Sequence, residues 1–181
     1  AGTANNGGGA VSINEGTVRL NKTAGIHAID ANVTVGTIAT NARLELAASN
    51  QIDHAGGTNV VNVVTVNHGS TFDLMGFSDQ IGSLVMNGGT VGTGTLSLGT
   101  NGTGVGSITY NVGSAAVINS NLVLEANRSV VVNDGNALND LTINGIISGD
   151  FALTKTNNAG TLVLNGANIH TGGTVLQGGV L

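Results

Sequence analysis

The stretch that decides the fold class runs from Phe72 to Tyr110 and reads FDLMGFSDQIGSLVMNGGTVGTGTLSLGTNGTGVGSITY. It contains four short units, each with two apolar residues flanking a third residue, which start every twelve residues: Phe72-x-Leu74, Leu84-x-Met86, Leu96-x-Leu98 and Ile108-x-Tyr110. Alternation with a period of two places both apolar residues of a unit on one face of a β-strand. Residues that favour turns, chiefly Gly, Asn, Ser and Thr, separate the units. The stretch therefore predicts short, half-buried strands joined by turns.

The same unit recurs along the rest of the chain, mostly at intervals of about seven to fifteen residues. The further copies are Val11-x-Ile13, Val18-x-Leu20, Val33-x-Val35, Leu44-x-Leu46, Val64-x-Val66, Leu122-x-Leu124, Val130-x-Val132, Leu141-x-Ile143, Phe151-x-Leu153 and Leu162-x-Leu164. No window shows the sustained i, i+3, i+4, i+7 spacing of an amphipathic helix. The sequence thus predicts an all-β protein.

The composition excludes several classes of protein. Of 181 residues, 30 are Gly, 24 Asn and 21 Thr, and only 8% are charged, with a net charge of −5. Five basic residues in an acidic chain cannot form a nucleic-acid-binding face. The absence of cysteine excludes disulfides and Cys-ligated metal sites. Disordered chains combine low hydrophobicity with high net charge, whereas 40% of these residues are hydrophobic.

Two all-β architectures fit regular short strands, a β-sandwich and a β-solenoid. Five Asn-Gly dipeptides suit either hairpin turns or solenoid corners: Asn6-Gly7, Asn87-Gly88, Asn101-Gly102, Asn144-Gly145 and Asn165-Gly166. Aromatic residues, which commonly fill sandwich cores, make up 2% of the chain. Recurring Thr and Asn suit ladders of like side chains stacked about 4.8 Å apart. We therefore expect a parallel β-helix, with a β-sandwich as the alternative.

Two segments, residues 143–181 and 66–98, resemble a known family. The first contains ISG at 147–149, LTK at 153–155, GTLVLNGAN at 160–168 and TGGT at 171–174. This order resembles the passenger-associated transport repeat of bacterial autotransporters. The second contains VNHGSTFDL at 66–74, IGSL at 81–84 and GGTV at 88–91, and resembles a segment found between such repeats.

The resemblance implies a right-handed parallel β-helix exported by a type V secretion system. It also implies a location outside the cell or on the bacterial surface. We expect residues 1–181 to form one β-helical segment of a longer repetitive passenger. With about 20 residues and ~4.8 Å per coil, the chain would have about nine coils and a length of roughly 43 Å.

The charged residues give no sign of catalysis. Hydrolysis of polysaccharides needs paired carboxylates, and lyases need an acidic calcium site beside a base. The ten acidic residues are scattered: Glu15, Asp30, Glu45, Asp53, Asp73, Asp79, Glu125, Asp134, Asp140 and Asp150. The five basic residues do not cluster either: Arg19, Lys22, Arg43, Arg128 and Lys155. We therefore expect no enzyme activity, no catalytic, cofactor-binding or metal-binding residues, and no cofactor.

Two minor features are candidate sites. Asp134 and Asp140 flank a Gly- and Asn-containing loop that could supply oxygen ligands to calcium, although an Asx-rich turn explains the loop better. The four histidines have no partner at i+4 and are expected singly at surfaces or corners: His27, His54, His68 and His170.

The function expected from these observations is structural or adhesive, in an extracellular passenger or stalk. The alternative is a β-helix that binds or degrades polysaccharides. The open ends of a β-helix expose unpaired strand edges, so end-to-end self-association into fibres is a further expectation. We expect no nucleic-acid partner and no membrane span, because no apolar run approaches ~20 residues. The sequence does not identify a ligand.

Overall fold

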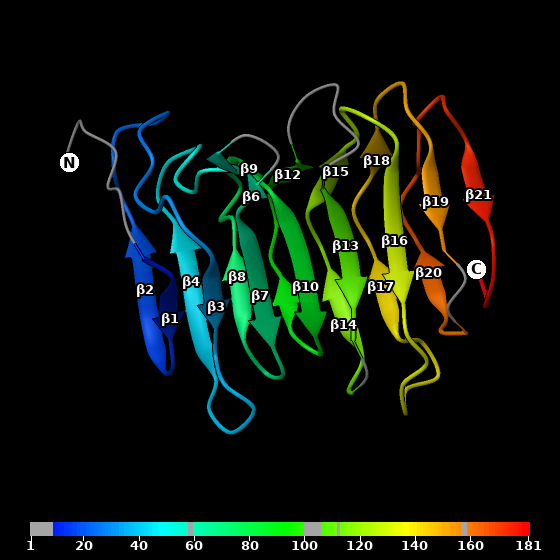
Figure 1. Ribbon diagram of the computed structural model, residues 1–181, viewed down its shortest axis with the longest axis horizontal. Coiled ribbons are helices and arrows are strands. Elements are labelled where there is room, and N and C mark those ends of the chain that lie inside the picture. The colour runs from blue at the N-terminus through cyan, green and yellow to red at the C-terminus, as the bar shows by residue number, and fades with distance from the viewer. Residues whose placement is uncertain (1–8, 58–59, 100–105, 112, 157–158) are drawn as a thin grey trace.

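The computed structural model of the protein describes residues 9–57, 60–99, 106–111, 113–156 and 159–181. Every regular element in these ranges is a β-strand, and none is a helix. The strands stack along one long axis, with β1 and β2 at one end and β21 at the other (Figure 1). The all-β prediction is confirmed.

Three parallel sheets run along this axis. The first has eight strands, in order β1 (Val11–Ile13), β3 (Val33–Val35), β7 (Val63–Asn67), β10 (Ser83–Asn87), β13 (Ser107–Tyr110), β16 (Arg128–Val132), β19 (Leu153–Lys155) and β21 (Thr174–Leu176). The second has seven, in order β2 (Gly16–Leu20), β4 (Ala42–Leu46), β8 (Thr71–Asp73), β11 (Thr90–Val91), β14 (Ala116–Ile118), β17 (Leu141–Ile143) and β20 (Leu162–Leu164). The third has four: β9 (Ser78–Ile81), β12 (Thr95–Leu98), β15 (Asn121–Val123) and β18 (Ile147–Ser148).

The chain visits the three sheets in turn, as in the succession β7, β8, β9 and then β10. Each new strand pairs in parallel with the strand of the preceding coil. Sandwich sheets are built from antiparallel strands, so the parallel β-helix is confirmed and the sandwich alternative is wrong. One antiparallel pair, β5 (Ala55–Gly57) with β6 (Val60–Val61), stands outside the three sheets.

The coils are longer than expected. Register partners are 20 residues apart between Val64 and Leu84 but 31 apart between Val33 and Val64. The longer coil contains the extra pair β5–β6, which the repeat pattern did not predict. The described first sheet therefore holds eight strands instead of nine, which spans roughly 34 Å at ~4.8 Å per step.

The interior is mostly aliphatic. Inward residues such as Val66, Leu84 and Val130 are fully buried, while their neighbours in each strand face outward. Each fully buried Val or Leu contributes about 1.5–3 kcal/mol to folding. Two aromatic residues are accommodated, Phe72 and Tyr110, and the Tyr110 hydroxyl lies 3.1 Å from the carbonyl of Gly113.

The expected apolar pair Phe151-x-Leu153 is wrong. Phe151 precedes β19 and is 37% exposed, whereas the inward residues of that strand are Leu153 and Lys155. Lys155 is completely buried, and its ammonium group donates to the carbonyl oxygen of Gly178 at 2.8 Å. Burial lowers the pKa of Lys155, and nearby Asp140 opposes that change. A polar partner inside the coil thus allows a lysine in a position expected to be apolar.

Glycine at the corners serves two purposes. Gly88 has a φ of 87°, the left-handed conformation expected of an Asn-Gly corner. Gly145 and Gly166 are not left-handed, and their role is close approach between coils. A Cβ at Gly145 would lie 1.9 Å from the Ser120 carbonyl oxygen. The dipeptides Asn6-Gly7 and Asn101-Gly102 lie outside the described residues.

Candidate functional site

A cluster of ionisable side chains forms where two successive coils meet, in the segments 26–30 and 51–54. An isolated parallel bridge pairs Ile29 with Ile52, and the Asp53 amide donates to the Ile29 carbonyl at 2.8 Å. This register places the residue after each isoleucine in the same column, so Asp30 and Asp53 lie on neighbouring coils. Like charges at directly adjacent positions destabilise a sheet. The pairing therefore needs a compensating positive group.

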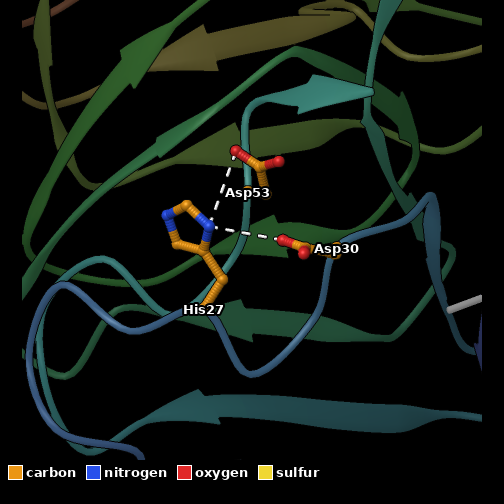
Figure 2. Close-up of side chains that lie close together, drawn as sticks. All are labelled: His27, Asp30 and Asp53. Atoms are coloured by element: carbon orange, nitrogen blue, oxygen red, sulfur yellow. Dashed lines mark ion pairs between the residues drawn. The ribbon is translucent and has the colours of Figure 1, made fainter. Parts of the chain in front are cut away.

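His27 supplies a nitrogen between the two carboxylates. Its Nδ1 atom lies 3.3 Å from Asp30 Oδ1 and 3.6 Å from Asp53 Oδ1, and the ring faces both groups (Figure 2). The side chains of His27, Asp30 and Asp53 are 22%, 23% and 19% exposed, so the cluster is largely buried but accessible to solvent. The Nδ1 atom of His54 lies 3.6 Å from the same Asp53 oxygen. Two imidazoles and two carboxylates thus converge.

A pocket of about 150 Å³ adjoins this cluster. His27, His54 and Ile52 line it, together with Asp79 and Gln80 of β9. Asp79 is almost fully buried and accepts hydrogen bonds from the amides of Gln51, Ile52 and Gln80. Desolvation raises the pKa of Asp79 to about 7, although these three amides oppose the rise.

The chemistry of the cluster suits a cation. Within the described part of the chain, His27, Asp30 and Asp53 form the group whose ligand atoms all lie within 4.8 Å of one another. One imidazole nitrogen and two carboxylate oxygens are ligands that zinc and related divalent ions accept. Both carboxylates face the same imidazole (Figure 2), whereas the two carboxyl groups of a glycosidase face the scissile bond between them.

A second ion-pair group lies on the second sheet. Arg43 on β4 donates through Nε to Glu45 at 2.6 Å and through a terminal nitrogen to Asp73 on β8 at 2.5 Å. The register places Glu45 directly opposite Asp73, so the guanidinium compensates a second pair of like charges. Since the guanidinium is already engaged by both carboxylates, this group is complete without a ligand.

The loop that contains Asp134 and Asp140 is held by backbone hydrogen bonds to Asp140. Asp134 is exposed, whereas Asp140 is buried. Its Oδ1 accepts from the Gly135 amide at 2.9 Å and its Oδ2 from the Thr161 amide at 2.8 Å. Both carboxylate oxygens of Asp140 therefore accept hydrogen bonds from backbone amides, one within the loop and one on the next coil.

The expectation that acidic residues and histidines stand singly is wrong at the cluster of His27, Asp30 and Asp53. His27 and His54 are half-buried partners of Asp30 and Asp53, although His68 is exposed as expected. His170 lies 2.9 Å from the Thr174 hydroxyl through Nε2. The signal that could have found the cluster is the repeated Ile-Asp dipeptide, at 29–30 and 52–53, with a histidine nearby in each copy.

Comparison with known proteins relates the chain to an autotransporter. No family model matches the sequence, and no solved structure matches it. Over 104 residues the chain is 36% identical to a protein named Adhesin BmaC autotransporter, from Brucella suis biovar 1 (strain 1330). The resemblance to autotransporter passengers is confirmed.

The match covers 55% of this passenger-like chain but 3% of the adhesin, so the chain spans a small fraction of that relative's length. Within the described ranges, no helix combines the length and apolar character needed to cross a bilayer.

Proposed function

We propose that this chain is a structural and adhesive segment of a longer extracellular passenger displayed on a bacterial surface, and that it acts by contact and not by catalysis. The observation that carries the proposal is the stack of parallel coils, joined to the similarity with an autotransporter adhesin. Coils that each contact their neighbours form a stiff rod, which suits a stalk that holds a surface away from the cell.

The outward face of the first sheet supplies groups for contact. Ser12, Thr34 and Thr65 occupy one column of paired positions, with Thr109 further along it. Their hydroxyl groups donate and accept hydrogen bonds, and they carry no charge that would limit partners to one sign. Such a face suits many weak polar contacts.

Adhesion can be tested with beads coated with the 181-residue chain and washed over monolayers of cultured cells. We expect several-fold more beads to remain than with the same beads carrying heat-unfolded chain. Equal retention of the two preparations would contradict an adhesive role of the folded surface.

The alternative is a polysaccharide-degrading or polysaccharide-binding β-helix. Asp30 and Asp53 are two carboxylates that lie near one another, but His27 lies between them. We expect incubation with neutral and acidic polysaccharides to release no reducing ends above a buffer control. Turnover that disappears in Asp30→Asn or Asp53→Asn would establish the enzyme instead.

End-to-end pairing belongs to the same proposal. On β21, Val175 and Leu176 are 44% and 48% exposed, and Val180 and Leu181 nearby are also exposed. In the 181-residue chain taken by itself, β21 is an edge strand, and an edge that offers unpaired backbone groups together with apolar side chains is a template for another β-coil. We expect the mass measured by light scattering to rise with concentration, and Leu176→Lys to reduce that rise. A constant monomer mass at high concentration would overturn end-to-end pairing.

A further inference from the structure

The column that holds Asp30 and Asp53 has an unusual electrostatic arrangement. Two carboxylates on neighbouring coils face one imidazole, at 3.3 and 3.6 Å from its Nδ1 atom. An N–H···O hydrogen bond is most favourable at 2.7–3.2 Å, and both separations exceed this range. Asp30 Oδ1 is buried and accepts no hydrogen bond from the described residues. Buried carboxylate oxygens without donors are costly, which indicates that a further group completes the cluster.

The separations fit one shared metal ion. When ligands lie 2.0–2.1 Å from a tetrahedral ion, their atoms are roughly 3.3–3.4 Å from one another. The distances from His27 Nδ1 to the two carboxylates are close to this value, and all three ligand atoms lie within 4.8 Å. Small side-chain movements would bring them to bonding distance.

We propose that His27, Asp30 and Asp53 bind a divalent transition-metal ion, for which Zn²⁺ is the probe, and that His54 contributes the fourth ligand. The mixture of nitrogen and oxygen donors favours Zn²⁺ and its neighbours over Ca²⁺ and Mg²⁺, which prefer all-oxygen sites. The Nδ1 atom of His54 lies 3.6 Å from Asp53 Oδ1, a separation that also suits two ligands of one ion.

The ion would join two coils. His27 and Asp30 come from one coil and Asp53 and His54 from the next, and the Ile29–Ile52 bridge sets their register. Charge neutralisation by a divalent cation converts a repulsive pair of carboxylates into a cross-link. The site therefore predicts stabilisation of these coils that depends on metal.

Calorimetric titration of ZnCl₂ into the chelator-treated chain tests the proposal. We expect one ion per chain, with affinity at least tenfold weaker in each of His27→Gln, Asp30→Asn and Asp53→Asn. The matched controls are His68→Gln and Asp134→Asn, which make the same chemical changes at exposed positions and should keep the parent affinity. Unchanged affinity in His54→Gln would remove His54 from the ligand set.

Thermal unfolding separates metal binding from a purely structural role. A saturating concentration of Zn²⁺, about a hundredfold above the dissociation constant, should raise the Tm of the parent by about 5 °C or more. Without metal, Asp30→Asn should be at least as stable as the parent, because it removes a like charge, yet it should lose the rise in Tm. Amide exchange should slow on adding Zn²⁺ within 26–30 and 51–54.

Three results would overturn the proposal. The first is that the parent binds Zn²⁺ no more tightly than the three substituted chains do. The second is that the two control variants lose binding to the same extent as those chains. The third is that the parent binds Ca²⁺ as tightly as Zn²⁺ and that this Ca²⁺ binding persists in His27→Gln.

Discussion

Asparagine side chains hold neighbouring coils together at the corners. The Asn87 amide donates to Asn67 at 2.7 Å and accepts from Asn111 at 2.8 Å. A second ladder joins Asn119, Asn144 and Asn165 with the same geometry, at 2.8 and 2.9 Å. A primary amide carries both a donor and an acceptor, so one side chain can bond to the coil before it and the coil after it. The abundance of Asn is thus a property of the stacking.

The middle rung of the first ladder gives a direct test. Asn87→Ala removes two hydrogen bonds and leaves partners on both sides unsatisfied, so we expect the free energy of unfolding to fall by about 1–2 kcal/mol. Asn136→Ala, at an exposed position, should change it by less than about 0.5 kcal/mol. Chemical denaturation measures both, and equal effects would show that the ladder adds nothing.

Asp79 makes stability depend on pH. Burial raises the pKa of its folded-state carboxyl to about 7, against about 3.9 for an unfolded Asp. Between these two pKa values the folded chain keeps a proton that the unfolded chain releases. The contribution of Asp79 to the free energy of unfolding is therefore complete below pH ~4 and is lost as the pH rises to about 7.

Replacement of Asp79 should reveal that contribution. We expect the free energy of unfolding of the parent, relative to Asp79→Asn, to decrease between pH ~4 and ~7 by an amount on the order of 3–4 kcal/mol, and to level off above pH ~7. Urea denaturation at a series of pH values measures this difference, and Asp134→Asn serves as the exposed control. A difference that is independent of pH would contradict the raised pKa.

At the scale of the coil element, the corners limit how closely strands can stack. A Cβ at Gly145 would lie 1.9 Å from the Ser120 carbonyl oxygen and 2.4 Å from its carbon, both backbone atoms of the preceding coil. Because backbone cannot rotate away as a flexible side chain can, added volume must push the coils apart.

Gly145→Ala should therefore destabilise the protein by about 2–4 kcal/mol, more than the ordinary range for a surface substitution. Gly9 has no neighbour within 4 Å of a built Cβ, and Gly9→Ala should leave stability within about 0.5 kcal/mol. The midpoints of thermal unfolding distinguish the two. If Gly145→Ala has the same unfolding midpoint as the parent, the corners have more space for a Cβ than this packing indicates.

The strands could be predicted because their pattern is local, whereas the cluster depends on register. Apolar pairs such as Leu84 and Met86 lie within one strand, and period-two alternation identifies them directly. The meeting of Asp30 with Asp53 depends on the number of residues in the intervening coil, and the coils differ in length. The inward position of Lys155 was missed for another reason, since an interior carbonyl partner leaves no trace in hydropathy.

At the scale of the whole molecule, burial changes along the axis. Leu84 and Val64 in the central coils are fully buried, whereas Val18 at one end and Leu176 at the other are 38% and 48% exposed. In a stacked array each coil is stabilised by its two neighbours, and a terminal coil has one. Local opening should therefore begin at the ends.

Hydrogen exchange read by mass spectrometry should show this gradient. We expect amides of β2 and β21 to exchange faster than those of β7 and β10 under native conditions. Added Zn²⁺ is left out, so that the cluster near β3 does not alter the profile. Uniform protection from β2 to β21 would indicate a single cooperative unit instead.

The outward column of hydroxyl residues has a consequence for recognition. Hydroxyl residues occupy this column on β1, β3, β7 and β13, whereas β10 and β16 place Val85 and Val131 in it, so the hydroxyl groups repeat at multiples of ~4.8 Å. A polymeric partner whose own repeat equals a small multiple of ~4.8 Å could contact many of these hydroxyl groups at once. The weak contacts would then add up to a higher overall affinity through avidity. Replacement of one hydroxyl residue would then weaken binding little. Deletion of a whole coil would move every hydroxyl group beyond it relative to the repeat of the partner.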